Sequence, residues 1–448
     1  MLFKRKKHAS QATRVIVSSF GAIILAGTLL LLLPAASAAG ESCGLMTALF
    51  TATSATCVTG LVLVDTLTAW SPFGQAVILV MIQLGGLGFM TLIFCIGLML
   101  RRTPSLSQRL LMVSAFNLND MSDTARVVRH ALRTTFLMEG AGAVILALCF
   151  APRHGWGAIW KGIFISVSAF CNAGFDLLGP EGIGSLSSYS GNPVVLLTVS
   201  VLVVCGGLGF FVWEELLQKR SFRRLTLYSK MVIIVTGALL AGGAVYFFCT
   251  EFSNEGTLGA MPVWGRAVNA LFQSVTLRTA GFAAIDQGAM SDVSKVMAIL
   301  FMLVGGSSGS TAGGIKTVTV CVLLLALRAS LRGKAQVTVR GRAIPLQKVL
   351  AALTLVLVVG GLFVISSMAI AIADGVPYLS AAFEAASAIA TVGLSTGITA
   401  GLSTFSHLLL IALMYLGRVG VLSFSIAFLT RSGGDSKISY PETNVVIG

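Results

Sequence analysis

Long apolar runs alternate with short amphipathic stretches along the whole chain. Four of the longest runs are Val15–Leu33, Val194–Phe211, Met231–Phe248 and Val349–Ile372. About 20 apolar residues are enough for a helix to cross the hydrocarbon core of a bilayer. Because every backbone polar group in lipid must be paired within the chain, helices are the expected spanning elements. The pattern predicts eight crossings, over residues 13–38, 74–100, 130–150, 193–217, 230–250, 294–328, 347–373 and 404–430.

A shorter stretch lies between the two helices of each pair, and it recurs four times. Each copy has a phenylalanine nine or ten residues before a glycine, which Leu or Phe follows; the glycines are Gly60, Gly174, Gly281 and Gly393, at intervals of 114, 107 and 112 residues. A second glycine-rich landmark follows each copy, at 84–89, 205–210, 304–309 and 416–421. Such internal repetition indicates one structural unit used four times. The short stretch cannot span the bilayer, which favours a re-entrant pore helix.

The predicted fold is therefore an all-α polytopic membrane protein with four tandem helix–pore-loop–helix repeats. Eight transmembrane helices and four re-entrant pore helices surround a central pore, and all four pore loops enter from the outer side. The expected organisation is a cytoplasmic N-terminus (1–12), pore repeat 1 (13–100), pore repeat 2 with an N-terminal cytoplasmic segment (101–218), pore repeat 3 with a broken last helix (219–328), pore repeat 4 (329–430) and a cytoplasmic C-terminal tail (431–448).

Composition and charge agree with a membrane protein and set its orientation. Hydrophobic residues make up 56% of the chain and charged residues 11%, whereas soluble domains carry about 25% charged residues. The net charge is +14, and most Lys and Arg cluster in five segments separated by hydrophobic hairpins. The positive-inside rule places these segments, and both termini, in the cytoplasm. No basic face is interleaved with aromatic residues, so nucleic acid is not an expected partner.

The four glycine turns are candidates for a cation filter. Irregular backbone at membrane depth is tolerated where it lines a water-filled path, and backbone carbonyls can replace the hydration shell of an ion. Glycine suits such a turn because it reaches positive φ and lets backbones approach closely. The alternative is that the glycines only relieve helix crowding, which does not account for the shared Phe-to-Gly interval. The candidate ion-binding residues are Val58, Thr59, Gly60, Asn172, Ala173, Gly174, Thr279, Ala280, Gly281, Thr391, Val392 and Gly393.

Acidic residues near the turns support cation traffic. The predicted outer segments include Asp65, Asp176 and Asp286, each within five residues after a filter glycine. A negative vestibule concentrates cations and repels anions. For any single acid, an ordinary solvated surface position is the competing interpretation.

Two further features point to a gate below the filter. The segment 305–316 holds too many glycines for a continuous helix; it resembles a phosphate-binding loop but lacks the preceding strand and the GKS/T ending. Arg418 replaces a glycine of the second landmark inside an apolar helix, where a charge is a functional-site hypothesis. We expect it to be a barrier in the pore; the alternative is an ion pair with a buried acid such as Glu139. The candidate gate residues are Gly305, Gly306, Ser307, Ser308, Gly309, Ser310, Thr311, Gly313, Gly314, Lys316 and Arg418.

Together these motifs resemble the Trk/Ktr/HKT superfamily of potassium translocators. The residues that carry the resemblance are the four loops, the stretch Gln273–Phe282, the broken helix Gly305–Lys316 and Arg418, and the similarity extends over roughly residues 13–448. The chain length and the ending Tyr440–Gly448 are most similar to the KtrB-type membrane subunits of bacterial Ktr potassium uptake systems. Cys57 and Cys171 are less usual at their positions, although a site made of carbonyls should tolerate them.

The resemblance implies potassium uptake across the bacterial cytoplasmic membrane, with K+ at the filter carbonyls and a gate at Gly305–Lys316 and Arg418. It also implies a membrane homodimer on a cytosolic ring of nucleotide-binding, KtrA-like regulatory subunits, with membrane lipid as a further contact and no organic cofactor on this chain. Gly60 favours K+ over Na+ in this family. The alternative is a sodium- or proton-coupled symporter, with Glu139 and Glu384 as its intramembrane carboxylates. An enzyme is not expected, because the four histidines lie apart and none is paired with an acid at helical spacing.

Overall fold

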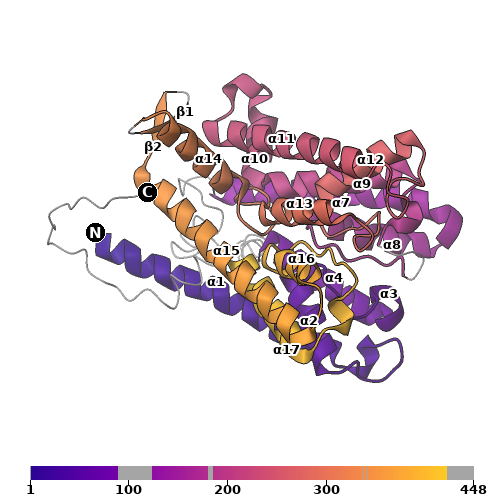
Figure 1. Ribbon diagram of the computed structural model, residues 1–448. Coiled ribbons are helices and arrows are strands. Elements are labelled where there is room, and N and C mark those ends of the chain that lie inside the picture. Colours follow the sequence, from indigo (N-terminus) through magenta and orange to yellow (C-terminus); the bar gives the residue numbers. More distant parts are fainter. Residues whose placement is uncertain (1, 89–123, 180–184, 335, 340, 421–448) are drawn as a thin grey trace.

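The computed structural model describes the chain except for residues 1, 89–123, 180–184, 335, 340 and 421–448 (Figure 1). The parts of the predictions that concern the cytoplasmic segment after residue 100 and the C-terminal tail fall mostly outside the described residues. What is described is almost entirely helical, and the helices follow the four predicted repeats in order. The prediction of an all-α polytopic fold is therefore confirmed.

Each repeat contains a long first helix, a short pore helix and a second helix. Repeat 1 comprises α1 (Leu2–Leu31), η1 (Pro34–Ala36), α2 (Leu45–Thr56), α3 (Thr66–Ala69) and α4 (Pro72–Leu87). Repeat 2 comprises α7 (Thr124–His154), α8 (Gly157–Phe170), η2 (Ser187–Tyr189), α9 (Pro193–Leu208) and α10 (Phe210–Lys219), followed by η3 (Phe222–Arg224). Repeat 3 comprises α11 (Leu227–Thr250), α12 (Val263–Thr276), α13 (Asp292–Leu303) and α14 (Thr317–Leu331). Repeat 4 comprises α15 (Leu346–Asp374), α16 (Tyr378–Ile389), η4 (Thr399–Gly401) and α17 (Thr404–Val419).

The lengths and exposed faces of these helices suit a bilayer. By length and composition, three helices of the described chain could cross a membrane, Leu132–His154, Leu227–Thr250 and Leu346–Asp374, and the bent pair α9–α10 is a fourth candidate. Large apolar side chains point outward from them, with Leu148 70% exposed, Val245 64% and Ile372 80%. Lipid tails cover such faces without cost, whereas a soluble monomer rarely exposes large apolar patches.

The four repeats pack in a closed cycle. The second helix of each repeat contacts the pore helix of the next: α4 packs on α8, α9 on α12, α13 on α16, and α17 on α2. The pore helices therefore lie in the interior; α16, for example, is buried from Ala381 to Ile389. Repeats 1 and 3 face each other across the cycle, as do repeats 2 and 4.

The second helices differ from the prediction in one respect. Only the helix over 294–328 was expected to break, and it does, between α13 and α14. However, the predicted helix over 193–217 is also bent, by 96° between α9 and α10. Gly209 at this bend has φ +88°, and Gly88 and Gly420 end α4 and α17 with φ +80° and +89°. A residue with positive φ cannot continue an α-helix, so α4, α9 and α17 end at the glycines of their second landmark, whereas α13 ends at Leu303, before its landmark.

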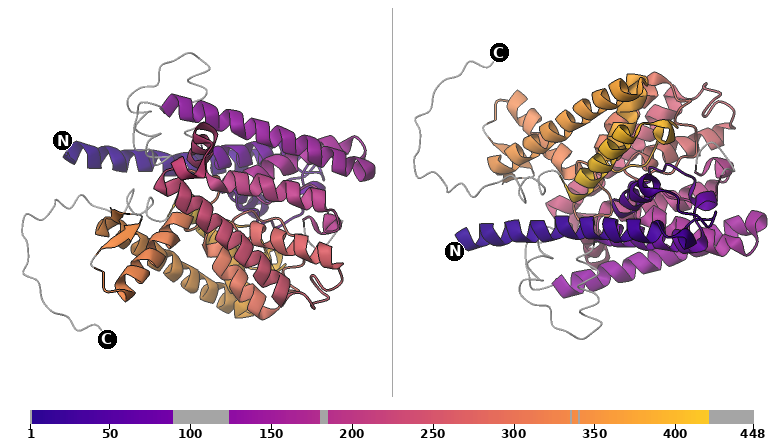
Figure 2. Two further views of the ribbon diagram at one scale, coloured as in Figure 1. Left: turned by 90° about the horizontal axis from the view of Figure 1, so that it is seen from above. Right: turned by 90° about the horizontal axis from the view of Figure 1, so that it is seen from below.

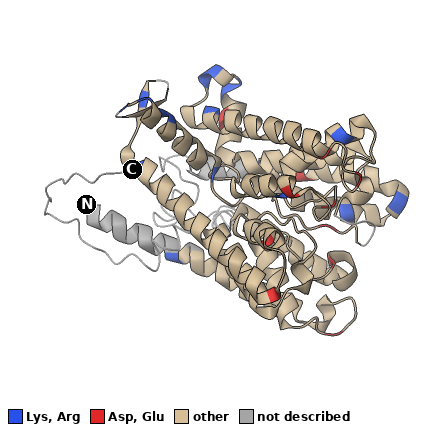
Figure 3. Ribbon diagram, in the orientation of Figure 1, with Lys and Arg blue, Asp and Glu red and all other residues tan. Residues whose placement is uncertain are grey.

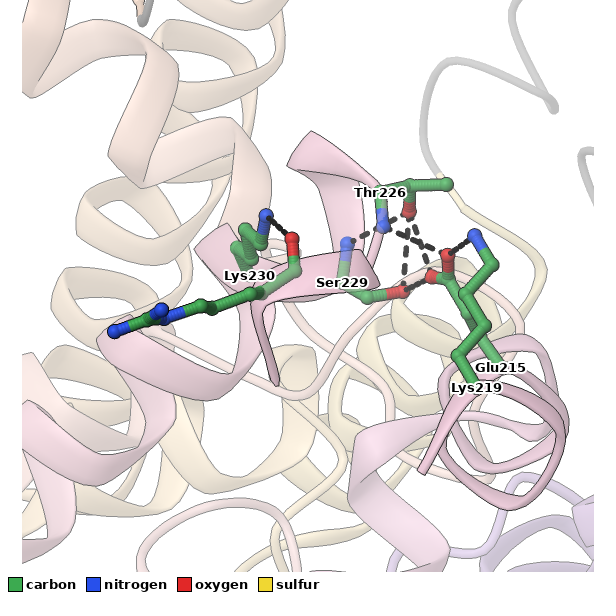
Figure 4. Close-up of polar contacts among 6 residues, drawn as sticks. Glu215, Lys219, Thr226, Ser229 and Lys230 are labelled. Atoms are coloured by element: carbon green, nitrogen blue, oxygen red, sulfur yellow. Dashed lines mark hydrogen bonds and ion pairs between the residues drawn. The ribbon is translucent and has the colours of Figure 1, made fainter. Parts of the chain in front are cut away.

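A polar cluster closes the bend of repeat 2 on the side where α11 begins. The Glu215 carboxylate of α10 accepts hydrogen bonds from Lys219 Nζ at 2.5 Å and from the Thr226 amide at 2.7 Å, and also from the hydroxyls of Thr226 and Ser229 (Figure 4). Thr226 in turn caps α11. These contacts fix α10 against the start of α11. Several cationic residues lie near the cluster in the sequence, among them Arg220, Arg223, Arg224 and Lys230.

Charged residues are sparse along the middle of the bundle and more frequent near its ends (Figure 3). A small hairpin that the sequence did not predict lies at one end, where β1 (Val337–Val339) pairs antiparallel with β2 (Arg342–Ile344) between α14 and α15. The start of α1 lies at this same end in Figures 1 and 2. The hairpin and the start of α1 are thus at one end of the described structure, and the cytoplasmic location of that end stays a prediction.

Candidate ion-conduction site

The four predicted turns have the same unusual backbone conformation. The residue two positions before each glycine is left-handed although it is not glycine: Val58, Asn172, Thr279 and Thr391 have φ of 56°, 59°, 62° and 52°. The four glycines themselves have φ between 71° and 98°. Positive φ is rare in a β-branched residue, and it persists only where contacts with the surrounding structure fix the backbone. Three of the four non-glycine residues are β-branched. The repeated strained conformation therefore indicates a functional site.

The four glycines meet in a ring, which we call the filter ring. A Cβ added at Gly60 would lie 2.4 Å from the Ala173 oxygen, and one at Gly174 would lie 2.8 Å from the Ala280 oxygen. One at Gly281 would lie 2.4 Å from the Val392 oxygen. The ring closes at Gly393, where an added Cβ would lie 2.1 Å from the Thr59 oxygen. Each glycine thus lies against the carbonyl that precedes the next glycine, and no side chain fits between them.

Hydrogen bonds from the pore helices hold the turns in place. The Gly60 amide donates to Ser54 Oγ and the Gly393 amide to Ser387 Oγ, both at 3.0 Å. The amides one position earlier, of Thr59 and Val392, donate to the carbonyls of the same two serines at 2.8 Å. Because these amides donate to the pore helices, they do not occupy the carbonyls of the turns. Those carbonyls therefore remain available to line the ring. The phenylalanines of the four repeats are buried behind the turns, each no more than 1% exposed: Phe50, Phe164, Phe272 and Phe383. Their packing explains why the Phe-to-Gly interval recurs in this sequence.

The acids beyond the ring stabilise backbone turns. Asp65 accepts from the Thr68 amide at 2.8 Å, Asp176 from the Leu178 amide at 2.9 Å, and Asp286 from the Gly288 amide at 2.8 Å. Each of the three therefore shapes the segment after its filter glycine. A charge contribution to the entrance stays a prediction.

The glycine-rich segment 305–316, which we call the gate loop, is attached to the bend of repeat 2. The Ser307 amide donates to the Gly207 carbonyl at 3.1 Å, and the Thr311 amide donates to the Gly206 carbonyl at 3.2 Å. The Phe210 amide donates to the Gly309 carbonyl at 3.1 Å. Tyr228, beside the Glu215 cluster, donates its hydroxyl to the Ser308 carbonyl at 3.0 Å. The loop is therefore linked to the same end of the molecule as the basic residues around Glu215.

The gate loop crosses beneath the filter ring. Thr311 Oγ1 donates to the carbonyl of Phe170, the last residue of pore helix α8, at 3.1 Å. Two residues later, a Cβ at Gly313 would lie 2.0 Å from Thr391 Oγ1, in the filter loop of repeat 4. Repeats 2 and 4 are opposite in the cycle, so the loop runs from one side of the ring to the other. It is ordered there by an internal bond, in which Lys316 Nζ donates to the Ala312 carbonyl at 2.7 Å.

Arg418 connects the gate loop to the end of α4. Its guanidinium donates to the carbonyl of Thr311 in the gate loop and to the carbonyls of Gly85 and Gly86 at the end of α4. Within the described residues it forms no ion pair, and the Glu139 carboxylate accepts from Gln83 instead. The predicted alternative of an ion pair between Arg418 and Glu139 is therefore wrong. Neutral carbonyls cannot cancel a guanidinium charge, so the cation stays uncompensated by direct contact.

The sequence identified the second glycine landmark but not its role. A Cβ at Gly85 would lie 2.0 Å from the carbonyl of Thr56, at Gly206 2.0 Å from that of Phe170, and at Gly417 2.1 Å from that of Ile389. These carbonyls end three of the pore helices. Each landmark glycine therefore lets a second helix support the end of its own pore helix. The only available signal was the recurrence of the glycine at a fixed offset.

This arrangement can coordinate a desolvated cation with backbone oxygens. The four carbonyls occupy equivalent positions around the ring, and a ring of backbone carbonyls is the kind of site that can replace an ion's hydration shell. Oxygen-only coordination suits alkali and other hard cations and disfavours soft metals. The gate loop and Arg418 meet next to the ring, where Arg418 donates to the Thr311 carbonyl; their action as an obstruction to ions stays a prediction.

Known proteins share this sequence and fold. A family model described as TrkH, a cation transport protein, matches residues 2–437. The potassium/sodium uptake protein NtpJ of Enterococcus hirae is 39% identical over 99% of both chains. The Ktr system potassium uptake protein B of Bacillus subtilis is 36% identical over 97% of this chain and 96% of its own. The crystal structure of the potassium transporter TrkH from Vibrio parahaemolyticus has the same fold, with a TM-score of 0.72 over 94% of this chain and 85% of that one at 18% identity. The resemblance found in the loops is thereby confirmed, and the chain belongs to the TrkH family of cation transport proteins.

Proposed function

We propose that this chain mediates potassium uptake across the bacterial cytoplasmic membrane, with K+ passing through the filter ring. The observation that carries the proposal is the closed ring of Gly60, Gly174, Gly281 and Gly393, each against a neighbouring backbone carbonyl. The names of the relatives from Enterococcus hirae and Bacillus subtilis, which are potassium uptake proteins, support the choice of ion. The filter residues are the three-residue sets that end at these glycines, and their carbonyls coordinate the ion.

Entry to the cytoplasm is controlled by the gate loop together with Arg418. In the described conformation the loop crosses below the ring, so ions pass only when the loop moves aside. The cytosolic regulator is a ring of nucleotide-binding subunits, which the membrane protein meets as a homodimer with both of its termini in the cytoplasm. The relative named as part of a Ktr system supports a multi-subunit assembly. The basic residues around Glu215 are suited to contact such a partner or anionic lipid.

The test is potassium-limited growth of a bacterial host that lacks its own potassium uptake systems. Expression of the chain with its regulatory ring rescues growth at low K+, with the dependence on added sodium measured in parallel. The Gly281→Asp variant places a side chain in the ring, where even a Cβ would meet the Val392 carbonyl, and abolishes rescue at unchanged membrane abundance. Normal rescue by Gly281→Asp contradicts the filter assignment. Rescue that disappears without sodium, together with sodium flux in fixed proportion to potassium, favours the coupled symporter.

A further inference from the structure

A carboxyl group of α7 lies inside the bundle without a cationic partner among the described residues. Glu139 is in α7 and only 4% exposed, and it is the only acidic residue of the candidate span Leu132–His154. Its carboxylate pairs with no cation in the described part of the chain. Carboxylates at this depth are costly, and they persist where they have a partner or a function.

Neutral donors hold this carboxylate in one place. Gln83 Nε2 on α4 donates to both of its oxygens, at 3.1 and 3.2 Å, and the Cys171 thiol approaches Oε1 at 3.8 Å. The backbone is fixed too, because Ser166 Oγ of pore helix α8 donates to the Glu139 carbonyl at 2.7 Å. The side chain is therefore aimed at the end of α8.

The end of α8 is where the second filter loop begins. Cys171 is the residue that caps α8, and Ala173, two residues later, supplies the ring carbonyl against Gly60. Both residues are fully buried. The Glu139 carboxylate therefore contacts the residue that lies two positions before the ring residue Ala173.

The same carboxylate lies across one turn of α4 from Arg418. Arg418 donates to the Gly86 carbonyl at 3.2 Å, and a Cβ at Gly86 would lie 2.6 Å from the Cys171 sulfur. The thiol that touches Glu139 thus also packs on the turn that Arg418 binds. A negative and a positive group face the two sides of this turn without touching each other.

We infer that Glu139 sets the charge of the filter, its carboxylate stabilising the permeating cation through the second loop and offsetting repulsion from Arg418. The inference rests on the proposed function. Burial with only neutral contacts disfavours the ionised form of Glu139, and a cation in the ring relieves that cost. Because coupling between two bound charges is reciprocal, the ionised carboxylate strengthens cation binding to the same degree. Glu139 is a positioning residue that acts on the ion through the loop and does not contact it.

The experiment compares initial rates of K+ uptake into proteoliposomes for the wild type, Glu139→Gln and Glu251→Gln. Glutamine keeps the size and the hydrogen bonding to Gln83 but removes the charge. We expect the half-saturating K+ concentration of Glu139→Gln to rise on the order of tenfold, the effect of a unit charge roughly 10 Å away at an effective dielectric of about 20. The maximal rate and the yield of folded protein stay near those of the wild type. Glu251 is also buried but belongs to a capping cluster away from the ring, so Glu251→Gln leaves the half-saturating concentration unchanged.

The outcomes separate this inference from the proposed function. Wild-type protein that takes up no K+ overturns the proposed function. Wild-type uptake with an unchanged half-saturating concentration in Glu139→Gln overturns the role of Glu139 alone, as does an equal rise in Glu251→Gln. If Glu139→Gln does not accumulate, Gln83→Leu serves instead: it removes both N–H contacts that favour the ionised carboxylate, so the half-saturating concentration rises. No rise in Gln83→Leu overturns the inference in that case.

Discussion

Replacing Gly393 with alanine separates backbone strain from loss of the filter ring. Gly393 has φ +98°, and its Cβ would lie 2.1 Å from the Thr59 carbonyl oxygen. Gly397, four residues later, has φ +93° but nothing within 4 Å of its Cβ. Alanine at either site carries the cost of a left-handed residue, about 1–3 kcal/mol. Cβ atoms essentially never approach a non-bonded heavy atom more closely than 3.0 Å. Only at Gly393 must a carbonyl, that of Thr59, move by about 1 Å to reach this distance.

The displaced carbonyl belongs to the proposed ion site, so Gly393→Ala should impair transport, whereas Gly397→Ala carries only the cost of the left-handed residue. A contact between a dipole and a charged group contributes about 1.5–3 kcal/mol, so Gly393→Ala should lower K+ uptake about ten- to a hundredfold. Gly397→Ala should keep most of the uptake. The assay is rubidium uptake into proteoliposomes, with the melting temperature of each variant in detergent as the control for folding. Equal uptake by the two variants at equal melting temperature refutes the reasoning.

Two other changes test the obstruction below the ring and the outer end of repeat 3. Arg418→Gln, which removes the charge but keeps donors for the Thr311 and Gly86 carbonyls, should raise uptake measured without the regulatory ring several-fold; a decrease at unchanged protein yield contradicts the barrier. Glu251 is buried, which raises its pKa, but hydrogen bonds from Ser294, Ser291, Thr257 and Asn254 outweigh this effect and hold the pKa below its usual value. Its ionised form therefore stabilises the fold above the ordinary glutamate pKa, and this contribution is lost as the pH falls through the lowered folded-state value. Glu251→Gln should lower the melting temperature at neutral pH by an amount equivalent to about 1–3 kcal/mol, and the difference from the wild type should shrink in acid; a constant difference at all pH values contradicts the assignment.

The repeats could be predicted from the sequence because they rest on periodic residues with strong physical preferences. Apolar length identified the spanning helices, and the interval from Phe50 to Gly60 recurred at three other places. The structure turns that interval into geometry, since the phenylalanines pack behind the turns and the glycines meet in a ring. The break before Lys316 was also predictable, because a continuous helix does not tolerate so many glycines.

The bends and the partner of Arg418 could not be predicted. Hydropathy does not register a change of direction, so Gly209 was indistinguishable from a glycine that eases packing in a straight helix. The cyclic order of the repeats depends on contacts between α17 and α2, at the two ends of the chain. Arg418 finds carbonyls on α4 and on the gate loop, which are far from it in the sequence, and no periodic signal encodes that choice.

The location of a bound ion tests most directly whether the filter ring coordinates the transported cation. Thallium replaces K+ at oxygen sites and scatters strongly, so a structure of the protein determined at saturating thallium shows where the ion lies. We expect a thallium peak on the axis of the ring, within coordination distance of the carbonyls of Thr59, Ala173, Ala280 and Val392. An empty ring, with thallium bound only elsewhere in a protein that transports K+, contradicts it.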